Sequence, residues 1–132
     1  MKILVIDDDV AMTDLVELIL ETVSIDVIKS NSAQEGLLLA KSDDPEMIIL
    51  DLMMPDIDGW QMCKKIREFS SVPILILSAL DSPGLVAKAL DLGADDFLVK
   101  PISKGMLIAN VNKMVRRNNF MLGGHRPTLI DL

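Results

Sequence analysis

The chain has 132 residues, half of them hydrophobic, which predicts one globular domain around a single core and excludes a disordered chain. Its formal net charge of −7 argues against direct binding to nucleic acid or to an anionic membrane surface, because phosphate groups select surfaces rich in Lys and Arg. Its one cysteine, Cys63, allows no internal disulfide and no thiolate zinc cluster, so we expect it to pack in the core of a cytoplasmic protein.

The first predicted element is a strand that begins at Met1-Lys2, so no leader peptide is expected. No apolar stretch reaches the roughly 18 residues that a membrane span needs. Five short runs rich in Ile, Leu and Val, bounded by polar or turn residues, are typical of buried parallel strands. They cover residues 2–6, 25–29, 47–50, 73–77 and 97–99.

Helical patterns follow each of these strands. Asp9, Ser32 and Ser103 can cap the first, second and fifth helices, and Pro83 fits the first turn of the fourth. The helices are expected to cover residues 9–23, 32–41, 59–69, 83–93 and 103–117. The residues expected to face inward are Met12, Leu15, Ile19 and Val23 in the first helix, Met62, Ile66 and Phe69 in the third, and Leu107, Val111 and Met114 in the fifth.

Polar side chains close four of the five strands. Asp7 and Asp8 follow the first strand, Asp51 the third, Ser78 the fourth and Lys100 the fifth. Strands that alternate with helices form a parallel sheet covered on both faces, and ligands bind at the edge where the carboxyl ends of such strands meet. These side chains are therefore expected to converge on one site.

The three carboxylates predict a metal site at that edge. Two like charges about 4 Å apart repel by about 4 kcal/mol at an effective dielectric constant of 20, so a cluster of Asp7, Asp8 and Asp51 needs compensation. A hard divalent cation supplies it, and Mg²⁺ favours oxygen ligands while it keeps several waters. The neighbouring Asp9 is interpreted as a helix cap.

The segment from Asp51 to Gly59 is predicted to form a tight loop, because it contains Pro55 and ends at a glycine. Such a loop can hold Asp51 away from the strand end and turn the backbone carbonyl of Met53 toward a metal.

Lys100 and Ser78 complete the predicted site. Lys100 precedes Pro101, a bond that can be cis, and its ammonium can reach a carboxylate or a phosphate as a point charge. The hydroxyl of Ser78 can donate to a phosphoryl oxygen. A metal, an ammonium and a hydroxyl around a carboxylate are what phosphoryl transfer needs.

Short motifs at these strand ends and in their loops carry a family resemblance. They are Ile6-Asp7-Asp8-Asp9, Asp51-Leu52-Met53-Met54-Pro55 with Gly59, Ser78-Ala79, Gly93-Ala94-Asp95-Asp96-Phe97 and Lys100-Pro101. With them the chain resembles the receiver domain of two-component response regulators, from Lys2 to about Arg117. The resemblance implies a flavodoxin-like (βα)5 fold of the α/β class, with strand order 2-1-3-4-5 and a receiver domain over residues 1–117.

The resemblance also implies a function, a phosphorylation-controlled signalling switch rather than a metabolic enzyme. Asp51 would accept a phosphoryl group from a phosphohistidine of a sensor histidine kinase, and the domain would assist its own phosphorylation and dephosphorylation. Asp8, Asp51 and the Met53 carbonyl would bind Mg²⁺ directly, and Asp7 directly or through water.

Four further positions carry roles in this resemblance. Ser78, the backbone of Ala79 and Lys100 would bind the phosphoryl group, and Lys100 would pair with Asp51 before phosphorylation. Ser78 and Phe97 would form the switch, which shifts the face made by the fourth helix, fifth strand and fifth helix and so regulates an output domain or a downstream protein, with transcription among the outputs.

The same face is where winged-helix members of the family pair charged residues to form homodimers. A homodimer is expected here only in a changed form, because two of the usual charges are absent. Lys88, Asp91, Asp95 and Asp96 fit the charge pattern, whereas Met106 and Asn110 stand where a Glu and an Arg are usual.

Two other function classes fit the sequence less well. A flavodoxin-like cofactor binder shares the strand order, but the first strand is followed by acidic residues and not by a Gly-rich or Ser/Thr-rich phosphate loop. A phosphatase with an aspartyl nucleophile would explain the spacing of Asp7 and Asp9 but not the loop that follows Asp51.

The tail over residues 118–132 differs from the rest of the chain. Gly123-Gly124 indicates a turn or hinge, and the last residues resemble a strand without a partner. The sequence leaves open whether this segment is a frayed terminus or a linker to an output domain.

Overall fold

The computed structural model describes residues 1–79 and 82–122, the last five of these as backbone only. Five strands form one sheet in the order β2-β1-β3-β4-β5, and every neighbouring pair is parallel. The fold class and strand order that the sequence predicted are confirmed. The strands are β1 (Lys2–Ile6), β2 (Asp26–Ser30), β3 (Met47–Asp51), β4 (Ile74–Ser78) and β5 (Asp96–Val99).

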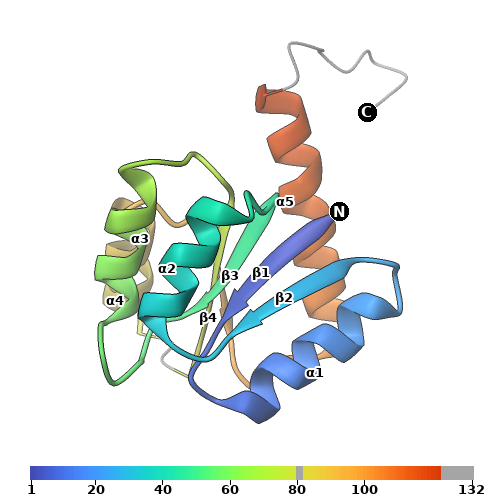
Figure 1. Ribbon diagram of the computed structural model, residues 1–132, viewed down its shortest axis with the longest axis horizontal. Helices are drawn as coiled ribbons and strands as arrows, with labels where there is room; N and C mark the ends of the chain where they lie inside the picture. The colour runs from blue at the N-terminus through green and yellow to red at the C-terminus, as the bar shows by residue number, and fades with distance from the viewer. Residues whose placement is uncertain (80–81, 123–132) are drawn as a thin grey trace.

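Five helices cover the two faces of the sheet (Figure 1). Their bounds are α1 (Val10–Glu21), α2 (Ala33–Ser42), α3 (Gly59–Arg67), α4 (Pro83–Asp91) and α5 (Lys104–Leu122). Side chains of α1 and α5 belong to one apolar cluster, and side chains of α2, α3 and α4 to the other. The strands lie between these clusters, which explains why they are apolar on both faces.

Polar side chains begin the helices much as the sequence predicted. The carboxylate of Asp9 accepts from the backbone N–H of Ala11 at 3.0 Å, and the hydroxyl of Ser32 accepts from Glu35 N–H at 3.1 Å. Ser103 caps α5, and Asp58, which was not predicted as a cap, accepts from Gln61 N–H at 2.8 Å.

The predicted buried face of α1 was partly wrong. The fully buried residues are Thr13, Val16, Ile19 and Leu20, whereas Leu15 and Val23 are 40% and 42% exposed. The two stripes share Ile19, and the buried one is turned from the predicted one by less than the roughly 100° that separates successive residues of a helix. The sequence pattern missed it because Thr13 looks polar, but its hydroxyl donates to the carbonyl of Val10 at 3.0 Å and can therefore be buried.

Two other helices end elsewhere than predicted. Helix α3 ends at Arg67, and Phe69 lies beyond it, 39% exposed, with the ammonium of Lys41 5.0 Å from its ring centroid. Helix α5 continues past Arg117 to Leu122, while its predicted inward residues are buried. The predicted turn at Gly123-Gly124 and the strand-like segment after it lie outside the described residues.

Helix α4 is held at one end by Arg67 of α3. Of the residues of α4, only Ala89 is fully buried. The guanidinium of Arg67 donates to the carbonyl of Gly93 at 3.0 Å, just beyond the helix, and to the carboxylate of Asp95 at 2.9 Å. Gly93 has a φ of +114°, which favours glycine.

No helix in the described part of the chain is both long and apolar enough to span a bilayer.

Candidate functional site

The predicted carboxylates meet at the carboxyl edge of the sheet, the edge toward which the strands point in Figure 1. Asp7 follows β1 directly, Asp8 comes next, and Asp51 ends β3. Each offers a carboxylate oxygen, and these oxygens all lie within 4.8 Å of one another. The convergence expected from the strand ends is therefore present in the structure.

Two of the three carboxylates are almost inaccessible to solvent. Asp7 is 2% exposed and Asp51 is 6% exposed, while Asp8 lies open to solvent. The pKa of Asp51 is raised from its ordinary value of 3.8 to about 6, first by burial and then by the negative charge of Asp7, while the positive charge of Lys100 opposes the rise. Keeping Asp51 ionised in this site therefore costs free energy when no cation is bound.

Lys100, whose side chain is partly buried, is the positively charged residue that contacts this cluster among the described residues. Its Nζ lies 2.9 Å from Oδ2 of Asp7 and 3.6 Å from Oδ1 of Asp51. Burial lowers the pKa of Lys100, but the hydrogen bond to Asp7 and the charge of Asp51 more than offset this, so its pKa lies above the ordinary value. The lysine thus contacts Asp7 more closely than Asp51, the predicted partner. The Lys100-Pro101 bond is cis, as anticipated.

The loop after β3 is closed by Gly59. Its backbone N–H donates to the carbonyl of Leu52 at 2.7 Å, and a Cβ at this position would lie 2.5 Å from the Cα of Leu52. Only glycine fits this close approach. Within the loop, the N–H of Met53 donates to Oδ1 of Asp51 at 3.4 Å, so the backbone folds around the carboxylate.

This set of donors fits a hard divalent cation. Three carboxylates converge, one of them opens to solvent, and hydrated Mg²⁺ prefers such oxygen ligands. One ammonium cannot neutralise three carboxylates, so the cluster retains a net negative charge that a cation would offset.

Ser78 and Phe97 lie on the two neighbouring strands beyond β3. Ser78 ends β4 and is fully buried, and its carbonyl accepts the backbone N–H of Lys100 at 2.8 Å. The next residue, Ala79, is exposed. The ring of Phe97 on β5 is partly buried and packs against the apolar cluster beneath α2, α3 and α4.

Two residues that sequence reasoning missed hold the first acidic loop. The side-chain amide of Asn31 donates to the carbonyl of Asp7 at 2.9 Å and to the hydroxyl of Thr13 at 3.1 Å. Neither residue belongs to a motif, and their positions in the sequence give no signal of this contact.

Two of the charged residues predicted for the dimer face form ion pairs within the chain itself. Asp95 pairs with Arg67 of α3, and Asp96 pairs with Lys113 of α5 at 2.7 Å. The ammonium of Lys88 lies 4.3 Å from the ring centroid of Trp60.

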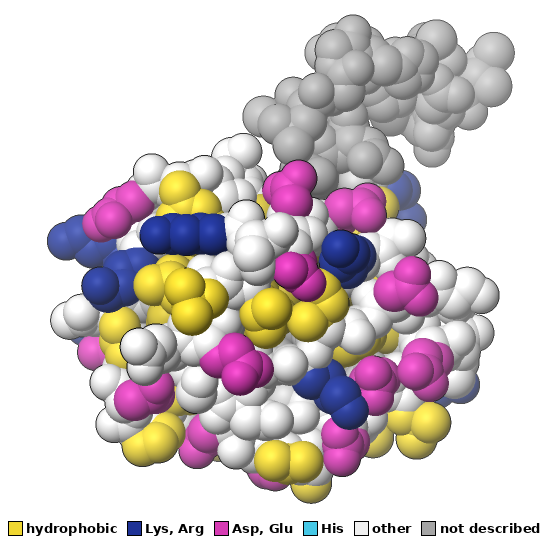
Figure 2. Space-filling view, in the orientation of Figure 1, with side chains coloured by type: hydrophobic (Ala, Val, Ile, Leu, Met, Phe, Trp, Pro, Cys, Tyr) yellow, Lys and Arg dark blue, Asp and Glu magenta, His cyan; other side chains and the backbone are white. Residues whose placement is uncertain are grey.

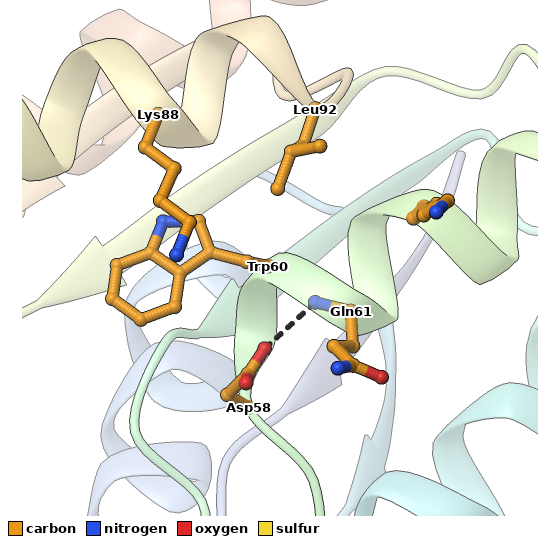
Figure 3. A pocket seen from close by; sticks show the side chains of 6 residues that line it. Asp58, Trp60, Gln61, Lys88 and Leu92 are labelled. Atoms are coloured by element: carbon orange, nitrogen blue, oxygen red, sulfur yellow. Dashed lines mark hydrogen bonds between the residues drawn. The ribbon is translucent and has the colours of Figure 1, made fainter.

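Trp60 and Lys88 also line a pocket of about 270 Å³ between α3 and α4, separate from the carboxylates (Figure 3). Asp58, Gln61, Lys64 and Leu92 complete its walls. On the face shown in Figure 2, Lys and Arg side chains gather over α3 and the neighbouring α2, whereas acidic side chains are spread more widely. The last turn of α3 is basic, with Lys64, Lys65 and Arg67.

Cys63, by contrast, is a free cysteine of the core. It is fully buried in the apolar cluster, as predicted, and burial raises the pKa of its thiol to about 11.

Comparison with known proteins agrees with the geometry. The family model of the response regulator receiver domain matches residues 3–112. A probable transcriptional regulator ycf27 of Porphyridium aerugineum is 40% identical over 116 residues, which are 88% of this chain and 48% of that protein. The alkaline phosphatase synthesis transcriptional regulatory protein PhoP of Bacillus subtilis is 38% identical over 118 residues, 89% of this chain and 50% of that protein.

A solved structure is similar in the same way. The crystal structure of a two-component response regulator from Clostridium difficile superposes with a TM-score of 0.86 and 32% identity, covering 89% of this chain and 98% of that one. The chain spans about half the length of the curated relatives it matches. With the carboxylate cluster, the lysine and the strand order in place, this chain belongs to the family of response regulator receiver domains.

Proposed function

We propose that Asp51 accepts a phosphoryl group from a phosphohistidine of a sensor histidine kinase. The observation that carries this proposal is its position, nearly buried within a carboxylate cluster and 3.6 Å from the ammonium of Lys100. A carboxylate oxygen of Asp51 attacks phosphorus, the P–N bond breaks, and the imidazole leaves. The rise in the pKa of Asp51 fits a carboxylate that is costly to keep ionised alone.

Asp7, Asp8, Asp51 and the backbone carbonyl of Met53 would hold Mg²⁺ at this site. The bound ion would neutralise charge on the phosphoryl oxygens. The chain's own contribution is to keep the carboxylates together, through Lys100 on Asp7 and through the loop that Gly59 closes.

Ser78, the backbone N–H of Ala79 and Lys100 would contact the phosphoryl group. Lys100 lies close enough to Asp51 to turn toward added phosphoryl oxygens. Ser78 and Phe97 would form the switch, because they lie at the carboxyl end of β4 and on β5, next to the face formed by α4, β5 and α5. A change there would pass to an output domain or to a downstream protein.

The longer relatives support a receiver domain over residues 1–117 joined through residues 118–132 to an output domain. Two relatives are described as transcriptional regulators, which supports control of transcription as the output. The net charge of −7 disfavours direct contact of this domain with nucleic acid or with an anionic membrane surface. The single cysteine is consistent with a reducing, cytoplasmic location. A homodimer through the α4-β5-α5 face would rely on apolar contacts of Leu90, Val99 and Met106, which are all exposed.

Phosphorylation by acetyl phosphate with Mg²⁺ tests the assignment. The wild-type chain should gain one base-labile phosphoryl group, seen by intact-mass spectrometry, and Asp51→Asn should gain none. Asp56→Asn, the same change at an exposed position of the same loop, is the matched control and should behave as the wild type. Full phosphorylation of the Asp51→Asn chain would refute the role of Asp51.

A further inference from the structure

The loop over residues 7–9, which carries Asp7 and Asp8, is hydrogen-bonded to Asn31 in the loop that follows β2. The amide nitrogen of Asn31 donates to the carbonyl of Asp7 at 2.9 Å and to Oγ1 of Thr13 at 3.1 Å. The hydroxyl of Thr13 in turn donates to the carbonyl of Val10 at 3.0 Å. Every polar hydrogen in this chain of contacts has an acceptor, and Thr13 is fully buried.

Two further hydrogen bonds, both donated by backbone N–H groups, complete this network, which we call the brace. The N–H of Asp7 donates to the carbonyl of Ser30 at 3.0 Å, and the N–H of Asp9 donates to Oδ1 of Asp7 at 2.9 Å. The loop that carries Asp7 and Asp8 is therefore tied to the end of β2 on one side and to the first turn of α1 on the other.

The brace acts against a force that the carboxylates themselves create. Asp7 and Asp8 repel Asp51, because their oxygens lie within 4.8 Å of one another and one ammonium cannot offset three negative charges. A loop free to relax would move Asp7 and Asp8 apart from Asp51. Holding the Asp7 carbonyl and the start of α1 in place keeps the three ligands converged before a cation binds, which lowers the reorganisation that binding requires.

We propose that Asn31 is a positioning residue of the cation site and that it acts together with Thr13. The inference rests on the proposed function, because it assigns Asn31 to the metal that would assist phosphorylation of Asp51. Asn31 would touch neither the ion nor the phosphoryl group. Residues that orient metal ligands in this way typically change metal affinity by about 10-fold to 100-fold when they are removed.

Substitutions that keep the shape and remove the hydrogen bonds test the proposal. Asn31→Leu keeps the branched side chain without the donor, and Thr13→Val keeps the branched side chain without the hydroxyl. The Mg²⁺ dissociation constant, followed by backbone amide shifts in an NMR titration, should rise about tenfold for Asn31→Leu and less for Thr13→Val. The double variant should bind about as weakly as Asn31→Leu alone, because the two side chains share one network.

Controls separate positioning from a merely structural role. Asn110→Leu is the same change at an amide that donates to the carbonyl of Met106 at 2.8 Å within α5, and it should leave the Mg²⁺ dissociation constant unchanged. Thr13→Ser retains the hydroxyl and should restore wild-type affinity. A purely structural role would lower the melting temperature of metal-free Asn31→Leu without a change in Mg²⁺ affinity, and that result would overturn the proposal.

The outcomes also separate this inference from the proposed function. A wild-type chain that takes up no phosphoryl group at Asp51 would refute the proposed function. A wild-type chain that is phosphorylated at Asp51, together with an Asn31→Leu chain of unchanged Mg²⁺ affinity, would overturn the role of Asn31 alone. If Asn31→Leu does not fold, the Thr13→Val and Thr13→Ser pair decides, since equal Mg²⁺ affinity in both would overturn the network.

Discussion

Asp51 is an ionisable side chain kept almost out of solvent, next to a second carboxylate. Its pKa of about 6, raised from 3.8, means that between these values the folded chain binds a proton that the unfolded chain has released. The stability that this group contributes is therefore greatest in acid and is lost as the pH rises through about 6. Without a cation, the site is least favourable at neutral pH, where the protein is expected to work.

Replacing this carboxylate should stabilise the metal-free domain. At neutral pH, Asp51→Asn is expected to raise the free energy of unfolding by up to about 3 kcal/mol, the equivalent of about two pKa units. Lys100 would not be left unpaired, because it keeps its contact with Asp7. Urea unfolding in a chelating buffer, repeated from neutral to acidic pH, measures the effect. The gain should vanish toward pH 4, and a gain independent of pH would contradict the assigned pKa.

Replacing Ser78, at the end of β4, is expected to leave phosphorylation intact while it blocks the conformational change that follows. Phosphorylation brings a charge of about −1.5 to −2, which shifts a conformational equilibrium only as far as the two states differ in how they hold it. Ser78→Ala should therefore accept a phosphoryl group at Asp51 yet fail to transmit it. NMR shifts of residues 84–110 with and without beryllofluoride measure transmission.

The matched control for that experiment is Ser82→Ala. Ser82 precedes α4, and its side chain makes no capping hydrogen bond. This variant should show the full wild-type shift pattern. If Ser78→Ala also shows the full wild-type shift pattern, the hydroxyl does not transmit the change. Coupling must then pass through Lys100 or the loop after Asp51.

At the scale of elements, α4 depends on α3 for its position. Arg67 bonds to backbone carbonyls before β4 and after α4, and its partner Asp95 also accepts the N–H of Ile74 at 2.8 Å. One guanidinium therefore joins three segments at the end of the sheet opposite the carboxylates. Because α4 buries only Ala89, the C-terminal end of the helix depends on this junction for its position.

Gly93 is the residue on which this junction depends most. A Cβ there would lie 2.7 Å from Cγ of Arg67, and the φ of +114° would strain any side chain. Gly93→Ala is therefore expected to lower the free energy of unfolding by about 1 to 3 kcal/mol. Gly105→Ala is the control, because nothing lies within 4 Å of its Cβ and alanine favours the helix by up to about 1 kcal/mol. Equal stability of the two variants in urea unfolding would contradict this account.

The elements themselves were largely predictable from the sequence, because strand ends and helix caps are local signals. The apolar runs before Asp7, Asp51, Ser78 and Lys100 were enough to place these residues at one edge of a parallel sheet. The brace from Asn31 and the junction at Arg67 were not predictable. Both consist of side chains bonded to backbone groups 24 and 26 residues away, and such contacts leave no periodic pattern. The buried stripe of α1 was missed because a hydrogen bond to the backbone was again involved. The hydroxyl of Thr13 donates to the carbonyl of Val10, which allows a polar residue to be buried.

At the scale of the molecule, part of the negative charge lies where a cation should bind. Three of the 20 acidic residues share one cluster with one lysine, which leaves a local excess of negative charge within the net charge of −7. Cation binding should therefore stabilise the whole domain, since a ligand that binds only the folded chain raises its stability by mass action.

Asp8→Asn tests this link between charge and stability. Removing one like charge should raise the melting temperature of the metal-free chain, because it relieves part of the repulsion. The same change should abolish the rise in melting temperature that Mg²⁺ produces in the wild type, as well as Mg²⁺-dependent phosphorylation by acetyl phosphate. Differential scanning calorimetry with Mg²⁺ and with chelator measures the first two effects. Normal phosphorylation of this variant at low Mg²⁺ would exclude Asp8 as a ligand.

The contact between Trp60 and Lys88 gives the molecule an optical property. Trp60 is the one tryptophan in a chain without tyrosine, so near-ultraviolet-excited emission is dominated by a single indole. That indole lies in the first turn of α3, just after the loop that carries Asp51, and its ring centroid lies 4.3 Å from the ammonium of Lys88 in α4. Emission intensity and wavelength should respond to the charge near the ring, and therefore to the distance between the two helices. The domain thus contains an intrinsic fluorescent probe of helix displacement, which allows rapid-mixing measurements on the unlabelled protein.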